Sequence, residues 1–324
     1  MVRARLTMLL LLVGAIAAAC GRTPPSPESL TTVRLPMGYL PNVQYAPFYV
    51  GVERGFFADE GLALDFDYAF ETDGIALVGA NELPFTLASA EQVLLARAQG
   101  LPVVYVLSWW NDFPVAVAAP ADGDIHTPQD LRGKRIGIPI LGGASYIGYR
   151  ALLDANAMPE DAAALDVIGF TQVEALLAGR VDAAVVYANN EPILLAARGL
   201  PVTLLRVADY VHLASNGLVT NETTLRENPE LVRRMVGATL KGIAAALADP
   251  EAAFQTSLDF VELEPADQAV QRQVLAATMD YWSSPRPGFS DPEAWQNMEQ
   301  VLLRMGLLTS TVDPGQAYSN EFIP

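Results

Sequence analysis

Aromatic and amide side chains gather in the loops that follow the strand-like runs of this sequence. A ring can stack against a planar group, worth about 0.5–1.5 kcal/mol beyond the area it buries, and fixed polar groups penalise the wrong edge of a ligand. The loop containing Tyr39, Asn42 and Tyr45 follows the first strand-like run, where an α/β sheet usually receives a ligand. The candidate ring faces are Tyr39, Tyr45, Trp109, Trp110, Tyr146 and Tyr187. The candidate edge groups are Asn42, Asp73, Ser89, Asn190 and Glu191.

Two of these loops leave alternatives open. Adjacent residues leaving a strand point in opposite directions, so we expect one of Trp109 and Trp110 to line the site and the other to pack in the core. Residues 142–145 (Gly-Gly-Ala-Ser) begin a helix and could offer backbone N–H groups to an oxygen-bearing group. They lack the spacing of a phosphate-binding loop, so an ordinary strand–helix turn is an equal alternative.

Catalysis and metal binding find little support in the sequence. His126 and His212 are the two histidines, and neither has a cysteine or carboxylate at a spacing typical of a metal site. A Gly-x-Ser-x-Gly nucleophile motif does not occur. We therefore expect a protein that is not an enzyme, with no metal and no cofactor.

The order of the expected elements predicts two α/β lobes. Strands and helices alternate from residue 33, which favours a mostly parallel first sheet, and a second α/β unit interrupts it before the chain turns helical. We place lobe 1 at residues 33–118 and 214–324 and lobe 2 at 119–213, with crossings near Ala118 and Leu213. A ligand is expected in the cleft between the lobes.

Composition excludes some partners. The chain has 324 residues, of which 51% are hydrophobic, and a formal net charge of −17. A length of this size suits about two domains, and the apolar fraction indicates a folded protein. Binding to nucleic acid needs a basic face, so the acidic balance argues against it.

The N-terminus predicts export and lipidation. Arg3 and Arg5 precede an apolar run from Met8 to Ala19, which is typical of a signal peptide (residues 1–19). Small residues then precede Cys20, the single cysteine, a pattern that resembles a bacterial lipobox. We expect an extracytoplasmic protein anchored by a lipid on Cys20, with residues 20–32 as a tether. A plain secretory signal or an uncleaved anchor is the alternative.

Several segments together resemble the NMT1/THI5-like family of solute-binding proteins from about residue 33 to residue 306. The segments that carry the resemblance are residues 39–42 (YLPN), 48–51 (FYVG), 54–57 (RGFF), 130–137 (DLRGKRIG), 179–183 (GRVDA) and 189–192 (NNEP). The resemblance implies a two-lobed periplasmic-binding-protein fold (type II) that closes on a vitamin-type heterocycle. It also implies a monomer that delivers this ligand to an ABC permease in the membrane.

Departures from the family pattern bear on the ligand. The family's pyrimidine synthase has a histidine where this chain has Tyr45, and a cysteine-rich motif that is missing here. The sequence is more similar to a branch associated with riboflavin uptake, so riboflavin is the expected transported ligand. Alternatives are formylaminopyrimidine, an alkylsulfonate-type anion and, in another class, a pyrimidine biosynthesis enzyme.

Overall fold

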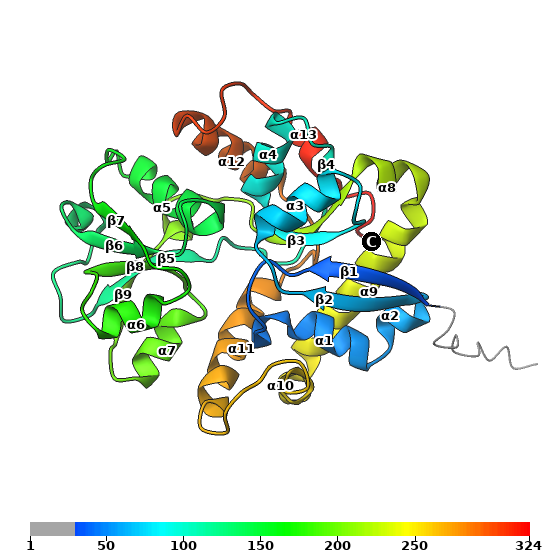
Figure 1. Cartoon of the computed structure of the whole chain (residues 1–324), viewed down its shortest axis with the longest axis horizontal. Helices are drawn as coiled ribbons and strands as arrows, with labels where there is room; N and C mark the ends of the chain where they lie inside the picture. Colours follow the sequence, from blue (N-terminus) through cyan, green and yellow to red (C-terminus); the bar gives the residue numbers. More distant parts are fainter. Residues whose placement is uncertain (1–29) are drawn as a thin grey trace, which may run out of the picture.

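The structure, a computed structural model, describes residues 30–324. Two lobes lie side by side, with the C-terminal helices on the larger one (Figure 1). The predicted signal peptide and the lipidation of Cys20 lie outside the described residues. The last two residues of the expected tether, Thr31 and Thr32, already belong to the first strand.

Lobe 1, here residues 31–110 and 216–324, contains two small sheets. Strands β1 and β2 pair in parallel, and a second sheet has the order β3-β10-β4. β10 runs antiparallel to both of its neighbours, so this sheet is antiparallel, and the expectation of a mostly parallel first sheet is wrong for it. The reason is that β10 enters from lobe 2, on its return from the second crossing. The strands are β1 (Thr31–Pro36), β2 (Leu62–Asp67), β3 (Thr86–Ser89), β4 (Val103–Ser108) and β10 (Asn216–Asn221).

Helices cover these sheets. The longest helix, α9, buries residues at three- and four-residue spacing from Leu231 to Ala246, as an amphipathic helix does. Gly242 lets α9 approach α1 closely, since a Cβ there would lie 2.1 Å from the Pro47 carbonyl oxygen. The helices are η2 (Val43–Tyr45), α1 (Ala46–Glu53), α2 (Phe56–Asp59), α3 (Glu71–Gly79), α4 (Ala90–Ala98), α8 (Glu222–Glu227), α9 (Pro229–Ala248), α10 (Pro250–Ser257), α11 (Gln268–Trp282), α12 (Pro292–Arg304) and α13 (Pro314–Ala317).

Lobe 2, here residues 115–206, is built on one five-stranded sheet of order β7-β6-β8-β5-β9. β6 is parallel to β7 and β8, whereas β5 is antiparallel to β8 and β9. The strands are β5 (Val115–Pro120), β6 (Arg135–Ile138), β7 (Ala164–Val167), β8 (Ala183–Tyr187) and β9 (Val202–Arg206). The helices are η3 (Pro128–Leu131), α5 (Gly143–Ala155), α6 (Gln172–Leu177) and α7 (Glu191–Ala197), with η4 (Val207–Asp209) after β9.

Alternation along β5 explains how helices cover both faces of this sheet. Val115 and Val117 belong to the core that includes α5, whereas Ala116 and Ala118 belong to the core with α6. All of β5 therefore lies in lobe 2, and the first crossing precedes Val115 instead of lying near Ala118. The small alanine side chains suit the close helix packing on the second face.

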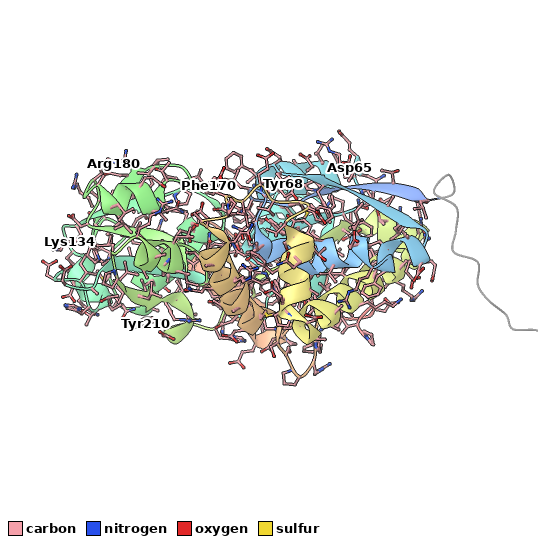
Figure 2. The ribbon with its side chains drawn as sticks, turned by 90° about the horizontal axis from the view of Figure 1, so that it is seen from below. Asp65, Tyr68, Lys134, Phe170, Arg180 and Tyr210 are labelled. Atoms are coloured by element: carbon pink, nitrogen blue, oxygen red, sulfur yellow. The ribbon has the colours of Figure 1, made fainter. Side chains whose placement is uncertain are left out.

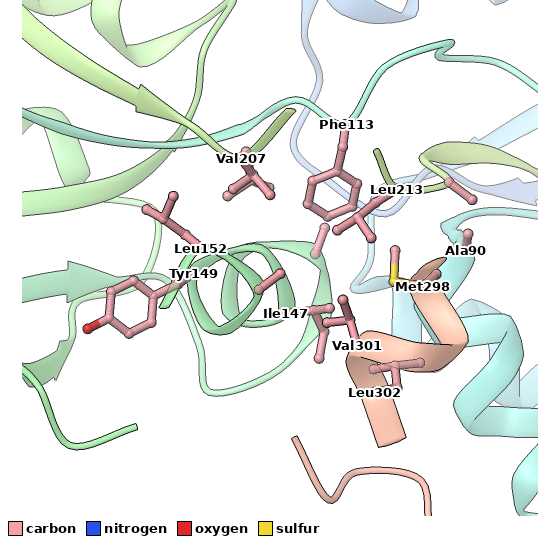
Figure 3. Packing of buried hydrophobic residues seen from close by; sticks show 14 of the residues in the cluster. Ala90, Phe113, Ile147, Tyr149, Leu152, Val207, Leu213, Met298, Val301 and Leu302 are labelled. Atoms are coloured by element: carbon pink, nitrogen blue, oxygen red, sulfur yellow. The ribbon is translucent and has the colours of Figure 1, made fainter. Parts of the chain in front are cut away.

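The two crossings, residues 111–114 and 207–215, pack together beside the cleft. Phe113 and Leu213 lie next to each other, between α5 of lobe 2 and α12 of lobe 1 (Figure 3). Met298 of α12 and Ile147 of α5 belong to the same buried cluster. The lobes are therefore joined by a shared apolar core beside the two crossings.

Candidate functional site

A cavity lies between the lobes. Its walls are loops and element ends, as expected for a ligand site of this architecture. From lobe 1 it is lined by Met37, Gly38, Tyr39, Gln44, Tyr45, Phe70, Glu71, Thr72, Leu87, Gln92, Trp109, Trp110 and Asn216. From lobe 2 it is lined by Pro139, Ile140, Gly142, Gly143, Ala144, Ser145, Phe170, Gln172, Tyr187, Asn190 and Glu191.

Stacked rings form the lobe 1 side of the cavity. Tyr45 stacks on Trp109 with ring centroids 5.3 Å apart and planes at 17°. The Tyr45 hydroxyl donates to the Met37 carbonyl oxygen at 2.7 Å, so the side chain is held by this hydrogen bond and by the stacking on Trp109. Tyr45 is only 4% exposed, which makes it a core residue as well as a wall of the cavity.

Both tryptophans line the cavity, and the expectation that only one would do so is wrong. Strand β4 ends at Ser108, so the alternation of a strand does not continue into the pair. Instead the backbone N–H groups of Trp109 and Trp110 both donate to the Asn216 carbonyl oxygen, at 3.1 and 3.0 Å. This turn brings both rings to one side, with centroids 5.3 Å apart.

Aromatic contacts also connect the two lobes. Trp110 and Tyr187 lie edge to face with centroids 5.7 Å apart. Closer to solvent, Phe170 of lobe 2 meets Tyr39 at 4.8 Å and Phe70 at 5.9 Å. Figure 2 shows Phe170 on the part of lobe 2 that faces lobe 1. Phe70 and Phe170 were not predicted as site residues; both are loop aromatics at element ends, and that position is the signal that could have identified them.

Glu191 is buried at the start of α7, although its place after a strand suggested a solvated side chain. Its Oε2 atom accepts a hydrogen bond from the Tyr187 backbone N–H at 2.9 Å, and its Oε1 atom accepts one from Asn190 Nδ2 at 3.3 Å. Burial raises the pKa of the Glu191 carboxyl above its ordinary value, because desolvation disfavours the charged form. The Asn190 Oδ1 atom has no hydrogen-bond partner among the described residues.

Glu71 and Asn216 form the polar part of the lobe 1 wall. Asn216 Nδ2 donates to Glu71 Oε1 at 3.0 Å, while Asn216 Oδ1 is buried without a partner in residues 30–324. The same holds for the indole Nε1 atoms of Trp109 and Trp110. Unmatched donors and acceptors around one cavity are costly unless a ligand or water pairs with them. Neither Glu71 nor Asn216 is among the edge groups expected from the sequence.

A buried amide joins the lobes below the aromatic wall. Asn189 Nδ2, just after β8, donates to Gln44 Oε1 at 2.8 Å and to Thr278 Oγ1 at 2.7 Å. Gln44 also lines the cavity. The contact ties lobe 2 to η2 and α11, so the lobes are in contact on both sides of the cavity.

Four of the predicted site residues lie outside the lining. Asn42 caps η2, with Oδ1 accepting from the Gln44 backbone N–H at 3.0 Å, and Asp73 is exposed on α3. The Ser89 hydroxyl is fully buried against Glu71 and Glu91. The Tyr146 hydroxyl accepts from Arg150 Nη1 at 2.6 Å. Their contact with ligand stays a prediction, and for these four the structure supplies another role or an exposed position.

The start of α5 borders the cavity. Its residues 142–145 line the site, and Gly143 has a φ of 63°, which favours glycine. A helix N-terminus presents unpaired N–H groups, so this part of the wall suits an oxygen atom of a ligand. The contact remains a prediction.

The cavity carries no cationic side chain. Among its lining residues, all within the described part of the chain, Glu71 and Glu191 are acidic and none is Lys, Arg or His. His212 instead contacts Asp291 at 3.0 Å outside this cavity. In residues 30–324 no group of three or more His, Cys, Asp or Glu side chains could hold a metal ion. The same residues contain no helix that is long and apolar enough to cross a membrane.

Comparisons with known proteins agree with this architecture. A family model described as NMT1/THI5 like matches residues 42–253. The riboflavin-binding protein RibY from Chloroflexus aurantiacus is 38% identical over 98% of this chain and 96% of its own length. The formylaminopyrimidine-binding protein from Halalkalibacterium halodurans is 28% identical over 98% of both chains. The alkanesulfonate-binding protein SsuA from Xanthomonas axonopodis pv. citri superimposes with a TM-score of 0.71 at 14% identity, covering 89% of this chain and 98% of that one. The fold is thus that of periplasmic binding proteins.

Proposed function

Because the chain belongs to the NMT1/THI5-like family, we propose that it is the solute-binding lipoprotein of an ABC importer and that its ligand is riboflavin. In this proposal a lipid on Cys20 holds the protein at the outer face of the cell membrane. The lobes close around one ligand molecule, and the closed monomer delivers it to the permease. Closure follows from a higher affinity of the ligand for the closed than for the open state.

The observation that carries the proposal is the composition of the cavity. Rings come from both lobes, and the unpaired polar atoms include donors (Trp109 and Trp110 Nε1) and acceptors (Asn190 and Asn216 Oδ1). A flavin is planar, uncharged and edged with both kinds of group. It can stack on the rings and pair with these atoms, and its hydroxylated chain can reach the N–H groups at the start of α5.

One alternative has specific support. The 28% identical relative binds formylaminopyrimidine, a smaller planar ring that the same wall could stack. A sulfonate ligand is less suited to this cavity, because an anion would meet two carboxyls and no cation. An enzymatic role is disfavoured, since both relatives named above are binding proteins and the synthase histidine is replaced by Tyr45.

The test is a ligand titration with the exported, mature protein. Protein purified without denaturation should carry the yellow absorbance of a flavin, and ligand-free protein should quench riboflavin fluorescence with a Kd below 1 μM, an order of magnitude typical of specific binding. Formylaminopyrimidine should compete weakly. Failure to bind riboflavin at micromolar concentration, together with tight pyrimidine binding, would sink the riboflavin assignment and favour the alternative.

A further inference from the structure

Besides the two acidic residues that line the cavity, a third one, Glu91, lies behind its wall and takes no part in the lining. Glu91, the second residue of α4, is 0% exposed, and the hydroxyl of Ser89 lies between its carboxyl and that of Glu71. Ser89 Oγ is 2.5 Å from Glu71 Oε2 and in short hydrogen-bond contact with Glu91 Oε1. Glu71 of α3, Ser89 of β3 and Glu91 of α4 thus form one buried, hydrogen-bonded triad.

A count of the hydrogen atoms indicates that this triad holds one proton more than two ionised carboxylates and a serine hydroxyl would. A serine hydroxyl has one hydrogen, so it can donate to only one of two carboxylate oxygens. The other contact is a hydrogen bond only if that carboxyl is protonated and donates to Ser89 Oγ. In this geometry both contacts are hydrogen bonds when one of the two carboxyls is a carboxylic acid.

The surroundings identify Glu91 as the protonated member. Glu71 accepts hydrogen bonds from the Ser89 hydroxyl, the Ser89 backbone N–H and Asn216 Nδ2, and such bonds favour the charged form. Besides Ser89, Glu91 has one side-chain partner, Gln92 Nε2 at 3.5 Å, and its Oε2 atom is unpaired among the described residues. Burial and the nearby Glu71 carboxyl raise the pKa of Glu91 to about 8.

The Glu71 end of the hydrogen-bonded triad reaches the cavity wall. Glu71 and Asn216 both line the cavity, and the hydrogen bond between them holds the Asn216 amide in one orientation. Gly38, with a φ of 82°, permits this packing, because a Cβ there would lie 2.7 Å from Glu71 Cγ. The protonation of Glu91 is thereby connected to groups that a ligand would touch.

We propose that Glu91 is a positioning residue whose proton holds Ser89, Glu71 and Asn216 in the ligand-binding arrangement, so that ligand affinity falls when this proton is lost. This inference rests on the proposed solute-binding function and names a determinant of affinity within the same site. Loss of the proton places two charged carboxylates against one hydroxyl hydrogen. Repulsion between the two carboxylates then breaks the hydrogen bonds of the triad and frees Asn216 from Glu71.

Among the described residues, no basic group is found to act on these two carboxyls and compensate for that second charge. The groups that interact with the two carboxyls are Tyr45 and Tyr187 with Glu71, and Tyr105 and Tyr187 with Glu91. Burial raises the pKa of each of these tyrosines, so they stay neutral through neutral and mildly alkaline pH. Glu191 interacts with Tyr187 from lobe 2 and is also acidic. Burial also raises the pKa of the Glu71 carboxyl, so Glu71 and Glu91 share one proton, and the Glu91→Gln variant identifies the part that Glu91 plays.

The experiment measures riboflavin affinity by fluorescence quenching from about pH 6 to about pH 9.5. If the deprotonated form does not bind, the Kd of the wild type rises about tenfold per pH unit above pH 8. Glu91→Gln keeps a neutral side chain that can donate to Ser89, so the rise in Kd should disappear. Glu82→Gln removes an exposed carboxyl after α3 and serves as the matched control, with the pH profile of the wild type.

Two further measurements test the inference even if riboflavin does not bind or Glu91→Gln does not fold. Infrared difference spectra of ligand-free wild type and Glu91→Gln should contain the C=O stretch of a protonated carboxyl at pH 7 in the wild type alone. This readout does not depend on the ligand, so it tests the proton even if riboflavin fails to bind. Proton uptake on binding, measured by calorimetry in two buffers, should approach one at pH 9 in the wild type, even if Glu91→Gln does not fold. A missing carboxyl band, or a wild-type Kd that is constant from pH 6 to pH 9.5, would overturn the inference.

Discussion

The lobe 1 wall of the cavity is tied together by side-chain hydrogen bonds, whereas the lobe 2 wall is made of loop ends and helix starts. In lobe 1, Tyr45 is fixed by Trp109 and the Met37 carbonyl, and Glu71 by Ser89 and Asn216. In lobe 2, Phe170 follows a glycine, and its aromatic contacts are with residues of lobe 1. The lobe 1 residues are held by partners within their own lobe, whereas the rings of lobe 2 make their aromatic contacts across the cavity, so substitutions in the two walls should have different effects.

The largest effect is expected for Tyr45→Ala in lobe 1. Removing a buried ring that stacks on Trp109 should lower the free energy of unfolding of the ligand-free protein by about 3 kcal/mol, as for other buried aromatic truncations. Urea denaturation measures this loss. Tyr45→Phe keeps the ring and removes one hydrogen bond, so it should cost about 1 kcal/mol. Equal stability of Tyr45→Ala and the wild type would contradict a lobe 1 wall that is held by partners within its own lobe.

Tyr187→Ala should separate affinity from stability in lobe 2. Tyr187 is half-buried and meets Trp110 across the cavity. Loss of its ring should weaken riboflavin binding about tenfold, since a stacking face is worth about 1 kcal/mol or more. Its effect on unfolding should be smaller than that of Tyr45→Ala. If Tyr187→Ala lost as much stability as Tyr45→Ala and kept its affinity, the Tyr187 ring would stabilise the fold and would not contact the ligand.

Phe170→Ala tests the entrance of the cavity. The ring touches Tyr39 and Phe70 of the opposite lobe, so it should stabilise the closed form. We expect about a twofold to fivefold weaker Kd, at the lower end of aromatic pair energies, expressed as faster dissociation in stopped-flow experiments. An effect confined to the association rate would show that Phe170 guides entry instead of holding the lobes together.

Tyr146→Phe should have the smallest effect. The Tyr146 hydroxyl lies outside the cavity lining and accepts from Arg150. We expect riboflavin affinity within about a factor of two of the wild type, because the hydroxyl does not line the cavity and the substitution keeps the ring. An affinity loss of tenfold would show that ligand contacts extend beyond the lining and would restore Tyr146 as a ligand residue.

Much of this arrangement follows from sequence patterns, and its failures have physical causes. The expected helical part after the second α/β unit is confirmed, and α11 illustrates the reason, because its apolar spacing agrees with the face that it buries. Both tryptophans line the cavity because one carbonyl, that of Asn216, accepts from both backbone N–H groups, and this contact crosses more than one hundred residues of sequence. Glu91 resembled an ordinary residue in the first turn of a helix, and only the fold reveals that it is buried against Glu71.

The antiparallel strand β10 has a consequence for the order of folding. It is the middle strand of the sheet β3-β10-β4, yet it follows all of lobe 2 in the chain. Lobe 2 is contiguous, so it can form as soon as its own residues are available, whereas lobe 1 must keep β3 and β4 unpaired until residue 221 arrives. An exported chain that emerges N-terminus first would therefore fold its second lobe before its first.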